Sequence, residues 1–523
     1  MPMNRTEQMR KASIHLRAWL LAPLLLILAG CASVDFDYPK TESTAIRDTR
    51  NTELAGEIDA GGPMQPGESG FYLLMDGIEA LAARLHMAER AEKTIDAQYY
   101  LITNDEIGMA FVGSLLQAAD RGVRVRLLLD DIQTQGYDAG MAALDSHPNF
   151  EVRIYNPFSS RGSRASAITE FGRVNRRMHN KSFTADNQIT IVGGRNIAAE
   201  YFSARDDVNF GDADVVGVGP VVRDVSDMFD IYWNSRAALP VPAFAKMPDD
   251  PDAALEQLRT RIDEAVGELR ETKYADAFKD SLQTIVDTDL EEFTFALYEL
   301  AYDSPDKSDK KLAAEAENIT TTLAESIARA EQSLFIISPY FVPLKSGIEY
   351  LTGLQERGVQ VSVLTNSLAA NNHSIVHSGY APSRKPLLEA GVKIYEVRPD
   401  AFVPGADRGG KGAALATLHT KGFVVDDQEL FLGSFNWDPR SVDINTELGV
   451  IMKSPELTQG ILTRLDAELD ENAYEVILND KGKIRWLDKS GDEVVVLDNE
   501  PQTGWWRRFV VDFYKILPVK KQL

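Results

Sequence analysis

The chain has 523 residues, enough for roughly two to four domains. Hydrophobic residues make up 44% and charged residues 26%, a globular balance that excludes a wholly disordered chain. The formal net charge is −24, whereas duplex nucleic-acid binders usually carry a basic face or domain, so no nucleic-acid partner is expected. A local basic cleft is still compatible with this charge.

Residues 1–30 have the pattern of a signal peptide, because a basic segment precedes the uncharged, Leu- and Ala-rich stretch 18–30. This stretch ends at Leu28-Ala29-Gly30-Cys31, which is similar to a bacterial lipobox, where the peptide is cut before the cysteine and the thiol is acylated. Cys31 is the only cysteine, so it is the candidate lipidation site and no intramolecular disulfide can form. The alternative is an uncleaved N-terminal anchor helix.

Residues 31–70 are rich in Thr, Asp, Gly and Pro and are expected to form a flexible tether. An α/β pattern then begins and is assigned to a first half, residues 71–237. An amphipathic helix is expected over 78–90 and a strand over 94–100. A further helix and a strand over 123–129 follow.

Residues 238–320 are acidic and helix-forming and predict a helical connector, with helical periodicity over 253–272 and 312–330. The α/β pattern then returns in a second half, residues 321–455. Arg121-Gly122-Val123 has its counterpart in Arg357-Gly358-Val359, and Ala91-Glu92 has its own in Ala330-Glu331. The shared order and near-constant offset of these echoes indicate an internal duplication.

The C-terminal extension, residues 456–523, contains a predicted amphipathic helix over 505–517. Trp505, Phe509, Phe513 and Leu517 recur at every fourth position, and basic residues lie off this stripe. A basic amphipathic helix with tryptophans can lie in a lipid interface. The alternative is that the stripe packs onto its own domain.

The sharpest repeat is a pair of short motifs, one in each half. His179-Asn180-Lys181 is matched by His419-Thr420-Lys421. The other positions that match at the same offset are Asp186 with Asp426, Gly193 with Gly433, and Asn196 with Asn436. Since the chain has only seven histidines, this coincidence is not accidental.

Each motif is expected to lead into a strand, over 182–185 and 422–425. Side chains at positions i and i+2 of a strand point to the same face, so each His-x-Lys places an imidazole beside an ammonium group. Two such strands in one cleft would surround a single anion with two histidines and two lysines, and Asn196 and Asn436 can add amide donors. This composition predicts a phosphate site.

Two imidazoles at one phosphate permit a division of labour. One can attack phosphorus and form a covalent phosphohistidine. The other can protonate the leaving oxygen and then deprotonate the incoming alcohol or water. Lysine and asparagine can neutralise the developing charge, so no metal or other cofactor is expected. Metal binding and ordinary structural roles are the alternatives, but neither motif brings a cysteine or a second close histidine at ligand spacing.

The His-x-Lys-x4-Asp pattern, followed by glycine and asparagine and present twice, resembles the signature of the phospholipase D superfamily. The resemblance implies an α/β fold of two related halves, each a mixed β-sheet flanked by helices, with one shared active site between them. It also implies that the two histidines are the nucleophile and the general acid/base, with His179 favoured as the nucleophile. The implied catalytic set is His179, His419, Lys181, Lys421, Asp186 and Asp426, with Asn196 and Asn436 binding the phosphate. The two aspartates can also brace the fold.

Members of this superfamily often support each histidine with a downstream acidic residue. Asp214, in Asp212-Ala213-Asp214-Val215-Val216, and Glu447, in Glu447-Leu448-Gly449-Val450, lie at comparable places before apolar strands. A carboxylate bonded to one ring nitrogen fixes the tautomer of the other. Asp214 and Glu447 are therefore the expected histidine-supporting residues, and ordinary strand-edge acids are the alternative.

Within the superfamily the sequence is most similar to bacterial cardiolipin synthases of the C-type branch, in segments 96–100, 338–343, 364–371 and 377–380. The resemblance implies a phosphatidyltransferase that makes cardiolipin-like phospholipid in a phospholipid membrane. Phosphatidylglycerol is the expected substrate and phosphatidylethanolamine a second candidate. The expected location is the bacterial cell envelope, lipid-anchored and facing the periplasm. The alternatives are a phospholipase D that releases phosphatidic acid, a nuclease or phosphodiesterase, and a non-catalytic lipid-binding envelope protein.

Overall fold

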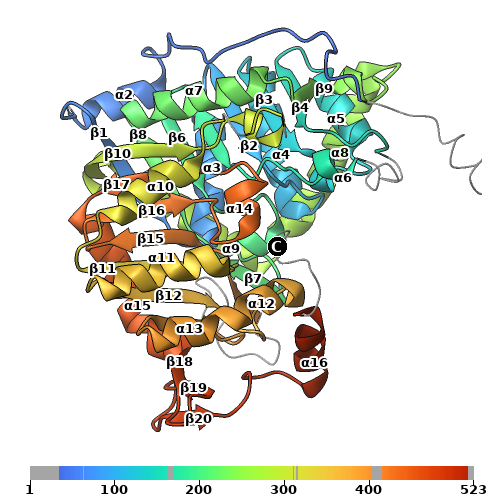
Figure 1. Cartoon of the computed structure of the whole chain (residues 1–523). Coiled ribbons are helices and arrows are strands. Elements are labelled where there is room, and N and C mark those ends of the chain that lie inside the picture. Colours follow the sequence, from blue (N-terminus) through green and yellow to red (C-terminus); the bar gives the residue numbers. More distant parts are fainter. Residues whose placement is uncertain are drawn as a thin grey trace, which may run out of the picture.

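The computed structural model describes residues 34–62, 64–161, 170–309, 311–313, 316–401 and 415–515. The expected signal peptide and Cys31 lie outside these residues. The described chain folds into two α/β halves whose strands join in one large mixed sheet (Figure 1). The predicted fold class is confirmed.

The first half has a mixed sheet whose core strands alternate with helices in the chain. Its strands are β1 (Glu68–Leu74), β2 (Thr94–Tyr99), β3 (Arg124–Asp130), β4 (Phe150–Tyr155), β5 (Ser182–Ala185), β6 (Ile189–Gly193) and β8 (Asp214–Val218). Strands β2, β3 and β4 run parallel, and β5 returns antiparallel to β2. The helices are α3 (Gly77–Arg90), α4 (Glu106–Asp120), α5 (Asp138–Asp145), α6 (Phe171–Val174) and α7 (Pro220–Asn234). Helices α3 and α4 pack in one apolar cluster and α7 in another.

The second half repeats this plan strand for strand. Its core strands are β11 (Ser333–Ile337), β12 (Gln360–Asn366), β13 (Lys393–Val397), β15 (Lys421–Val425), β16 (Glu429–Gly433) and β17 (Leu448–Lys453). Strands β11, β12 and β13 are parallel and β15 is antiparallel to β11, as in the first half. The helices are α10 (Ile319–Ala328), α11 (Leu344–Glu356), α12 (Ser374–Tyr380), α13 (Arg384–Glu389), α14 (Pro439–Asp443) and α15 (Pro455–Asn472).

The connector is not purely helical, which corrects the prediction for 238–320. It contains the expected helix α8 (Pro251–Arg270) and a second helix, α9 (Lys273–Asp287), but also the nine-residue strand β10 (Thr294–Tyr302). β10 pairs with β1 on one side and with β17 on the other. It therefore fuses the sheets of the two halves, and these distant partners stabilise a strand that local periodicity does not reveal.

Residues 34–62 are not a flexible tether, which corrects a second prediction. This segment runs along the first half, and its carbonyl groups accept hydrogen bonds from buried arginines. Arg126 donates to Ser43 O at 3.0 Å and Arg153 donates to Thr41 O at 2.6 Å. The segment ends in helix α2 (Glu53–Ala60). Its loop-like composition is compatible with this irregular path, but the buried guanidinium groups hold it in place because they need acceptors.

The C-terminal extension also belongs to the sheet. Strand β18 (Ala473–Leu478) pairs with β13, as β9 (Ala238–Pro240) pairs with β4 in the first half. Each half thus extends past its predicted limit at 237 or 455. Strands β19 (Ile484–Asp488) and β20 (Val495–Leu497) and helix α16 (Trp505–Tyr514) follow. No helix within the described ranges is long and apolar enough to cross a membrane.

The motif aspartates Asp186 and Asp426 brace turns and do not contact either histidine. The carboxylate of Asp186 accepts from the backbone N–H groups of residues 92, 93 and 94 at 2.7–2.9 Å. Asp426 accepts in the same way from residues 331, 332 and 333 at 2.7–2.8 Å. This corrects their place in the predicted catalytic set. Each carboxylate instead fixes the chain at the start of a central strand.

The Asp186→Ala variant should be destabilised by about 2–4 kcal/mol, because three backbone donors lose their acceptor in a fully buried place. The matched variant Asp426→Ala should lose only about 1 kcal/mol, since Asp426 is half-exposed and water can replace the carboxylate. Urea unfolding measures both changes. Equal losses in the two variants would contradict this account.

Candidate active site

The two His-x-Lys motifs lie where the halves meet, and each is held by the backbone of the opposite half. The N–H of His179 donates to Thr446 O at 2.8 Å. The N–H of His419 donates to Gly211 O at 2.7 Å, at the end of a parallel pairing between β7 (Val208–Gly211) and β14 (Leu415–Leu418). The structure thus brings both motifs to one interface.

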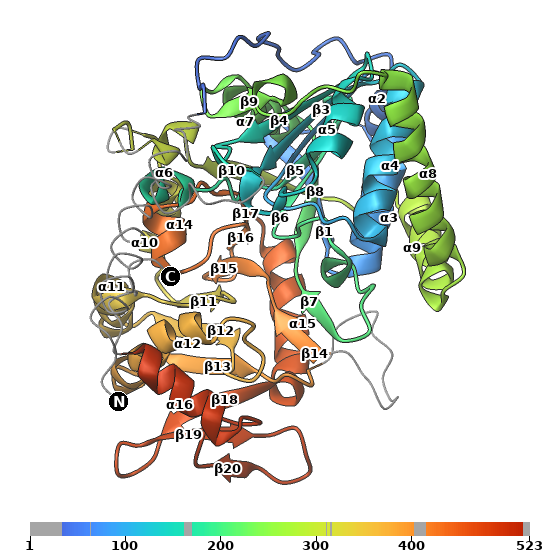
Figure 2. The ribbon, with the colours of Figure 1, turned by 90° about the vertical axis from the view of Figure 1, so that its right-hand side faces the viewer.

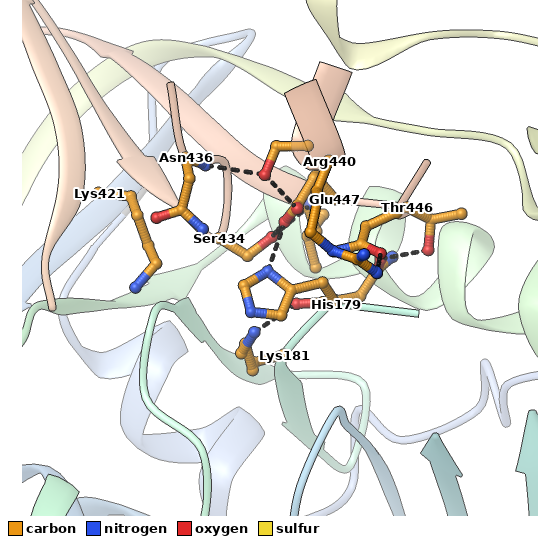
Figure 3. Close-up of polar contacts among 12 residues, drawn as sticks. His179, Lys181, Lys421, Ser434, Asn436, Arg440, Thr446 and Glu447 are labelled. Carbon is orange, nitrogen blue, oxygen red and sulfur yellow. Dashed lines mark hydrogen bonds and ion pairs between the residues drawn. The ribbon is translucent and has the colours of Figure 1, made fainter. Parts of the chain in front are cut away.

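His179 is hydrogen-bonded through Nδ1 to Oε2 of Glu447 at 2.8 Å, which Figure 3 shows together with the neighbouring lysines. Lys181 donates to the carbonyl of His179 at 2.5 Å. The ring of Tyr100 packs edge-on against the imidazole, with centroids 5.0 Å apart. Since an ionised carboxylate only accepts hydrogen bonds, Nδ1 carries the hydrogen and Nε2 keeps a lone pair.

His419 has the corresponding arrangement with a different carboxylate. Its Nδ1 is hydrogen-bonded to Oδ2 of Asp212 at 2.5 Å, and Lys421 Nζ lies 3.1 Å from Nε2. Phe210 stacks on the imidazole with centroids 5.4 Å apart, and Tyr201 packs edge-on at 4.9 Å. The ring is therefore held by a polar contact at one edge and by aromatic contacts at its surfaces.

The carboxylate that supports His419 is Asp212, so the expectation for Asp214 was wrong. The strand register shows why. β6 pairs Gly193 with Asp214, whereas β16 pairs the equivalent Gly433 with Gly449. The residue two positions earlier is Asp212 in one half and Glu447 in the other. The common pattern of an acid three residues before a valine could have identified Asp212 in the sequence.

Asp214 has a structural role in the first half. Its buried carboxylate pairs with Arg84 at 2.8 Å and with Arg195 at 3.3 Å. The positions equivalent to Arg195 and Asp214 in the second half are Phe435 and Gly449, so the ion pair of the first half has uncharged residues in its place in the second. The two halves share the arrangement of histidine, lysine and carboxylate but differ in the residues packed behind it.

The two carboxylates also differ in their own partners. Glu447 accepts hydrogen bonds from Ser434 at 2.5 Å and from Ser441 at 2.7 Å. The position equivalent to Ser434 is Gly194, where an added Cβ would lie 2.3 Å from a carboxylate oxygen of Asp212. Gly194 is therefore required for the close approach of Asp212, and the two histidines are in unlike surroundings.

The predicted phosphate-binding groups line the same interface. Asn196 donates to the hydroxyl of Tyr201 at 2.8 Å. The side-chain oxygens of Asn196 and Asn436 are buried and have no hydrogen-bond partner among the described residues. Buried polar atoms normally have partners, so these amides are suited to contact a bound group. Figure 3 shows the side chains of Lys421 and Asn436, which come from the second half, together with that of His179 from the first.

Both imidazoles are held in the neutral form. Burial, with the nearby lysines, lowers the pKa of His179 to about 4 and that of His419 to about 3, against the opposing effect of their carboxylates. Burial also lowers the pKa of Lys421 to about 8. Each lysine lowers the pKa of the opposite histidine, which indicates that the two motifs share one electrostatic environment. A neutral imidazole with a free Nε2 is the form that acts as a nucleophile.

Comparisons with known proteins show what the chain is similar to. A family model described as "Cardiolipin synthase, PLD-like domain" matches residues 85–233 and 323–469, which lie in the two halves. Cardiolipin synthase C of Escherichia coli is 40% identical over 463 residues, which cover 87% of this chain and 96% of that protein. Cardiolipin synthase A of Pseudomonas syringae pv. syringae is 25% identical over 428 residues, covering 81% of this chain and 73% of that protein.

A solved structure has the same fold. The crystal structure of phosphatidylserine synthase from Haemophilus influenzae superposes with a TM-score of 0.56 and covers 88% of this chain and 96% of its own. The sequence identity is only 14%, so this likeness concerns the arrangement of the two halves alone.

Acid should destabilise the fold through the buried histidines. An unfolded histidine has a pKa near 6.5, so between pH 6.5 and the folded value of about 3 the unfolded chain binds one more proton at His419 and stability falls with pH. Acidification to about pH 5 should cost about 2 kcal/mol through His419. The carboxyls of Asp130 and Asp438 have raised pKa values and act in the opposite direction, so the effect must be measured as a difference.

Urea unfolding at neutral pH and at about pH 5 gives this difference when the wild type is compared with His419→Asn. The variant should lose about 2 kcal/mol less on acidification than the wild type. The same pH dependence in both proteins would show that folded His419 takes up protons as readily as an unfolded histidine.

Proposed function

This chain belongs to the PLD-like cardiolipin synthase family, and from this premise we propose that it is a phosphatidyltransferase that makes cardiolipin-like phospholipid through a covalent phosphohistidine. The observation that carries the proposal is the pair of His–Lys–carboxylate sets in one interface between the halves. Cardiolipin synthases join two phospholipids, which requires that one phosphoryl group leave one alcohol and be transferred to another. Two imidazoles, each held through Nδ1 by a carboxylate, suit these two tasks.

In the first step, we assign the attack on phosphorus to Nε2 of His179. The new bond joins Nε2 to phosphorus, and the bond from phosphorus to the headgroup oxygen breaks. His419, in its protonated form, gives its Nε2 proton to that oxygen, and the negative charge of the bound phosphate and of Asp212 favours the protonated form. Lys181 and Lys421 offset the charge on the phosphoryl oxygens.

In the second step, the hydroxyl of a second phospholipid replaces the headgroup. Neutral His419 takes the hydroxyl proton, the alcohol oxygen attacks phosphorus, and the bond from phosphorus to His179 breaks. His179 is thereby released as a neutral imidazole, and His419 is ready for another first step. Phosphatidylglycerol has the free hydroxyl that an acceptor needs, and phosphatidylglycerol or phosphatidylethanolamine can serve as the donor. Water in the place of the acceptor would give phosphatidic acid.

We further propose that the mature chain begins at an acylated Cys31 and faces the periplasm in the bacterial envelope. The lipobox-like sequence and the signal-peptide pattern support this proposal. Lipid attachment adds about 0.8 kcal/mol of membrane binding for each buried methylene, so two or more acyl chains hold a protein firmly at the surface where its phospholipid substrates lie.

His179→Ala and His419→Ala should each reduce turnover by about 10⁴-fold or more without unfolding the protein, because each step needs both a nucleophile and a proton carrier. The measurement is release of headgroup from labelled phosphatidylglycerol, with circular dichroism as the folding check. His373→Ala is the matched control, since His373 is half-exposed and should be dispensable. Near-normal turnover in either folded active-site variant would overturn the two-histidine mechanism.

The same assay separates the two aspartates. Asp212→Asn should reduce turnover by about 10²–10⁴-fold, because the tautomer and the imidazolium form of His419 lose their support. Asp214→Asn should affect mainly the stability of the fold. The opposite ranking would restore Asp214 as the supporting residue.

In phospholipid vesicles the enzyme should make more dimeric phospholipid than phosphatidic acid. An acceptor alcohol outcompetes water only if it is held in place, and such positioning is worth about 7–11 kcal/mol of barrier. The measurement is the product ratio by mass spectrometry, with phosphatidylglycerol alone and mixed with phosphatidylethanolamine. Predominance of phosphatidic acid in both mixtures would indicate a phospholipase D with the same catalytic residues.

Mass spectrometry of the membrane-extracted protein should show an N-terminus at Cys31 that carries acyl mass. The Cys31→Ser variant should lack this mass, because no other cysteine is available. An intact N-terminus at Met1 with an unmodified thiol would favour the uncleaved anchor helix instead.

A further inference from the structure

Helix α16 is fixed to the second half by one side only. It lies beside α12 in both views of the molecule (Figures 1 and 2). Val511 is buried in this contact, and the guanidinium group of Arg507 donates to Asn371 O at 2.6 Å. The segment before the helix is anchored by Glu500, which pairs with the buried Arg384 at 2.6 Å. The helix is therefore held in a defined orientation.

The opposite side of α16 is an exposed aromatic face. We define it by Trp505, Trp506, Phe509 and Phe513, whose exposed fractions are 70%, 60%, 54% and 53%. The rings contact one another: the centroids of Trp505 and Trp506 are 5.4 Å apart, and Trp506 stacks on Phe509 at 5.5 Å. Trp505, Phe509 and Phe513 of the stripe expected from the sequence thus do not pack onto their own domain, and Leu517, its fourth member, lies outside the described residues. Such a cluster of large exposed aromatic groups marks an interaction surface.

The sequence segment that contains α16 has a net charge opposite to that of the whole chain. The chain carries a formal charge of −24, but the sequence from 505 onward has one acidic residue, Asp512, against five basic ones. These basic residues are Arg507, Arg508, Lys515, Lys520 and Lys521. The single acid is paired with Lys515 at 2.8 Å. An aromatic face with basic neighbours is complementary to anionic lipid headgroups.

The anchor of α16 is connected to the active site. Arg507 binds the loop after β12, and in this loop Ala370 O accepts a hydrogen bond from Thr417 at 2.9 Å. The neighbouring Asn366 forms two hydrogen bonds of 2.9 Å with the backbone of Leu418, the residue before His419. A short chain of direct contacts therefore joins the helix to β14, the strand that ends one residue before His419.

We propose that the aromatic face of α16 docks on the surface of a phospholipid bilayer that contains anionic lipid. Tryptophan and phenylalanine enter the boundary between headgroups and acyl chains, while the net positive charge of the segment attracts the anionic headgroups. Because the helix is tied to the strand before His419, this contact sets the distance and orientation of the active site relative to the lipids. The inference deepens the proposed function, since it specifies how a phospholipid substrate is presented.

The direct test uses the full chain and vesicles of equal parts phosphatidylglycerol and phosphatidylcholine in which the phosphatidylcholine acyl chains are brominated. Bromine quenches tryptophan fluorescence only at close range. Trp19 is first replaced with phenylalanine in both proteins. We expect the Trp19→Phe protein to be quenched and the Trp19→Phe, Trp505→Phe, Trp506→Phe variant to lose most of this quenching, because Trp233, Trp437 and Trp486 are not part of the aromatic face. Equal quenching of the two proteins would overturn the proposal.

The functional test replaces all four aromatic residues with alanine, which preserves helix propensity. We expect turnover of vesicle phosphatidylglycerol to need about tenfold more lipid for half-maximal rate, because membrane binding scales with the apolar area buried. Turnover of a short-chain, monomeric phosphatidylglycerol should be unchanged. The control variant, Ile231→Ala with Val286→Ala, removes exposed apolar groups from α7 and α9 and should behave as the wild type in both assays.

The outcomes separate this proposal from its rivals. If the four-alanine variant loses a dimer seen by light scattering without lipid, and quenching is unchanged, the face contacts a second copy of the chain and the proposal fails. Loss of turnover on both substrates would show a structural role and would also overturn it. Quenching does not depend on catalysis, so a wrong assignment of the reaction would leave the result of the first test intact.

Discussion

The imidazole of each His-x-Lys motif takes its carboxylate from the opposite half of the molecule, and the rest of the structure depends on this exchange. His179 belongs to the first half and is bound by Glu447 of the second, and His419 of the second half is bound by Asp212 of the first. A buried carboxylate that lost its imidazole would lose a hydrogen-bond donor, and leaving a buried polar group without its partner commonly costs about 1–3 kcal/mol, and more when the group is charged. The same two hydrogen bonds therefore complete the candidate site and hold the two halves together.

The connector contributes to this constraint. β10 fuses the two sheets, and Asp303, the residue after it, accepts the backbone N–H of Glu447 at 2.9 Å. The neighbouring Lys307 is paired with Asp303 at 2.9 Å and also donates to the carbonyl of Ser441 at 2.8 Å. The segment between the halves thus positions one of the two carboxylates as well as linking the sheets.

The sequence predicted the features that depend on short spacing. The two His-x-Lys motifs, the asparagines and the duplicated α/β order were recognisable because each motif is short and recurs in the second half at nearly the same offset. The features that it missed depend on contacts between distant segments. The choice of Asp212 over Asp214 depends on strand register, β10 is stabilised by β1 and β17, and Thr41 is held by Arg153. The partners of β10 and of Thr41 are too far away in the chain to leave a local pattern. Asp212 had a local signal, the spacing to a valine that it shares with Glu447, but only the strand register gives that signal its meaning.

The exchange of carboxylates also determines when the enzyme can first act. During synthesis the first half emerges complete with His179 and Lys181, but its imidazole has no carboxylate until the chain has been extended to Glu447 and folded back. Asp212 is likewise made long before His419. The nascent protein therefore contains no complete site for most of its synthesis. The order of residues along the chain is enough to keep it inactive until then, without an inhibitor.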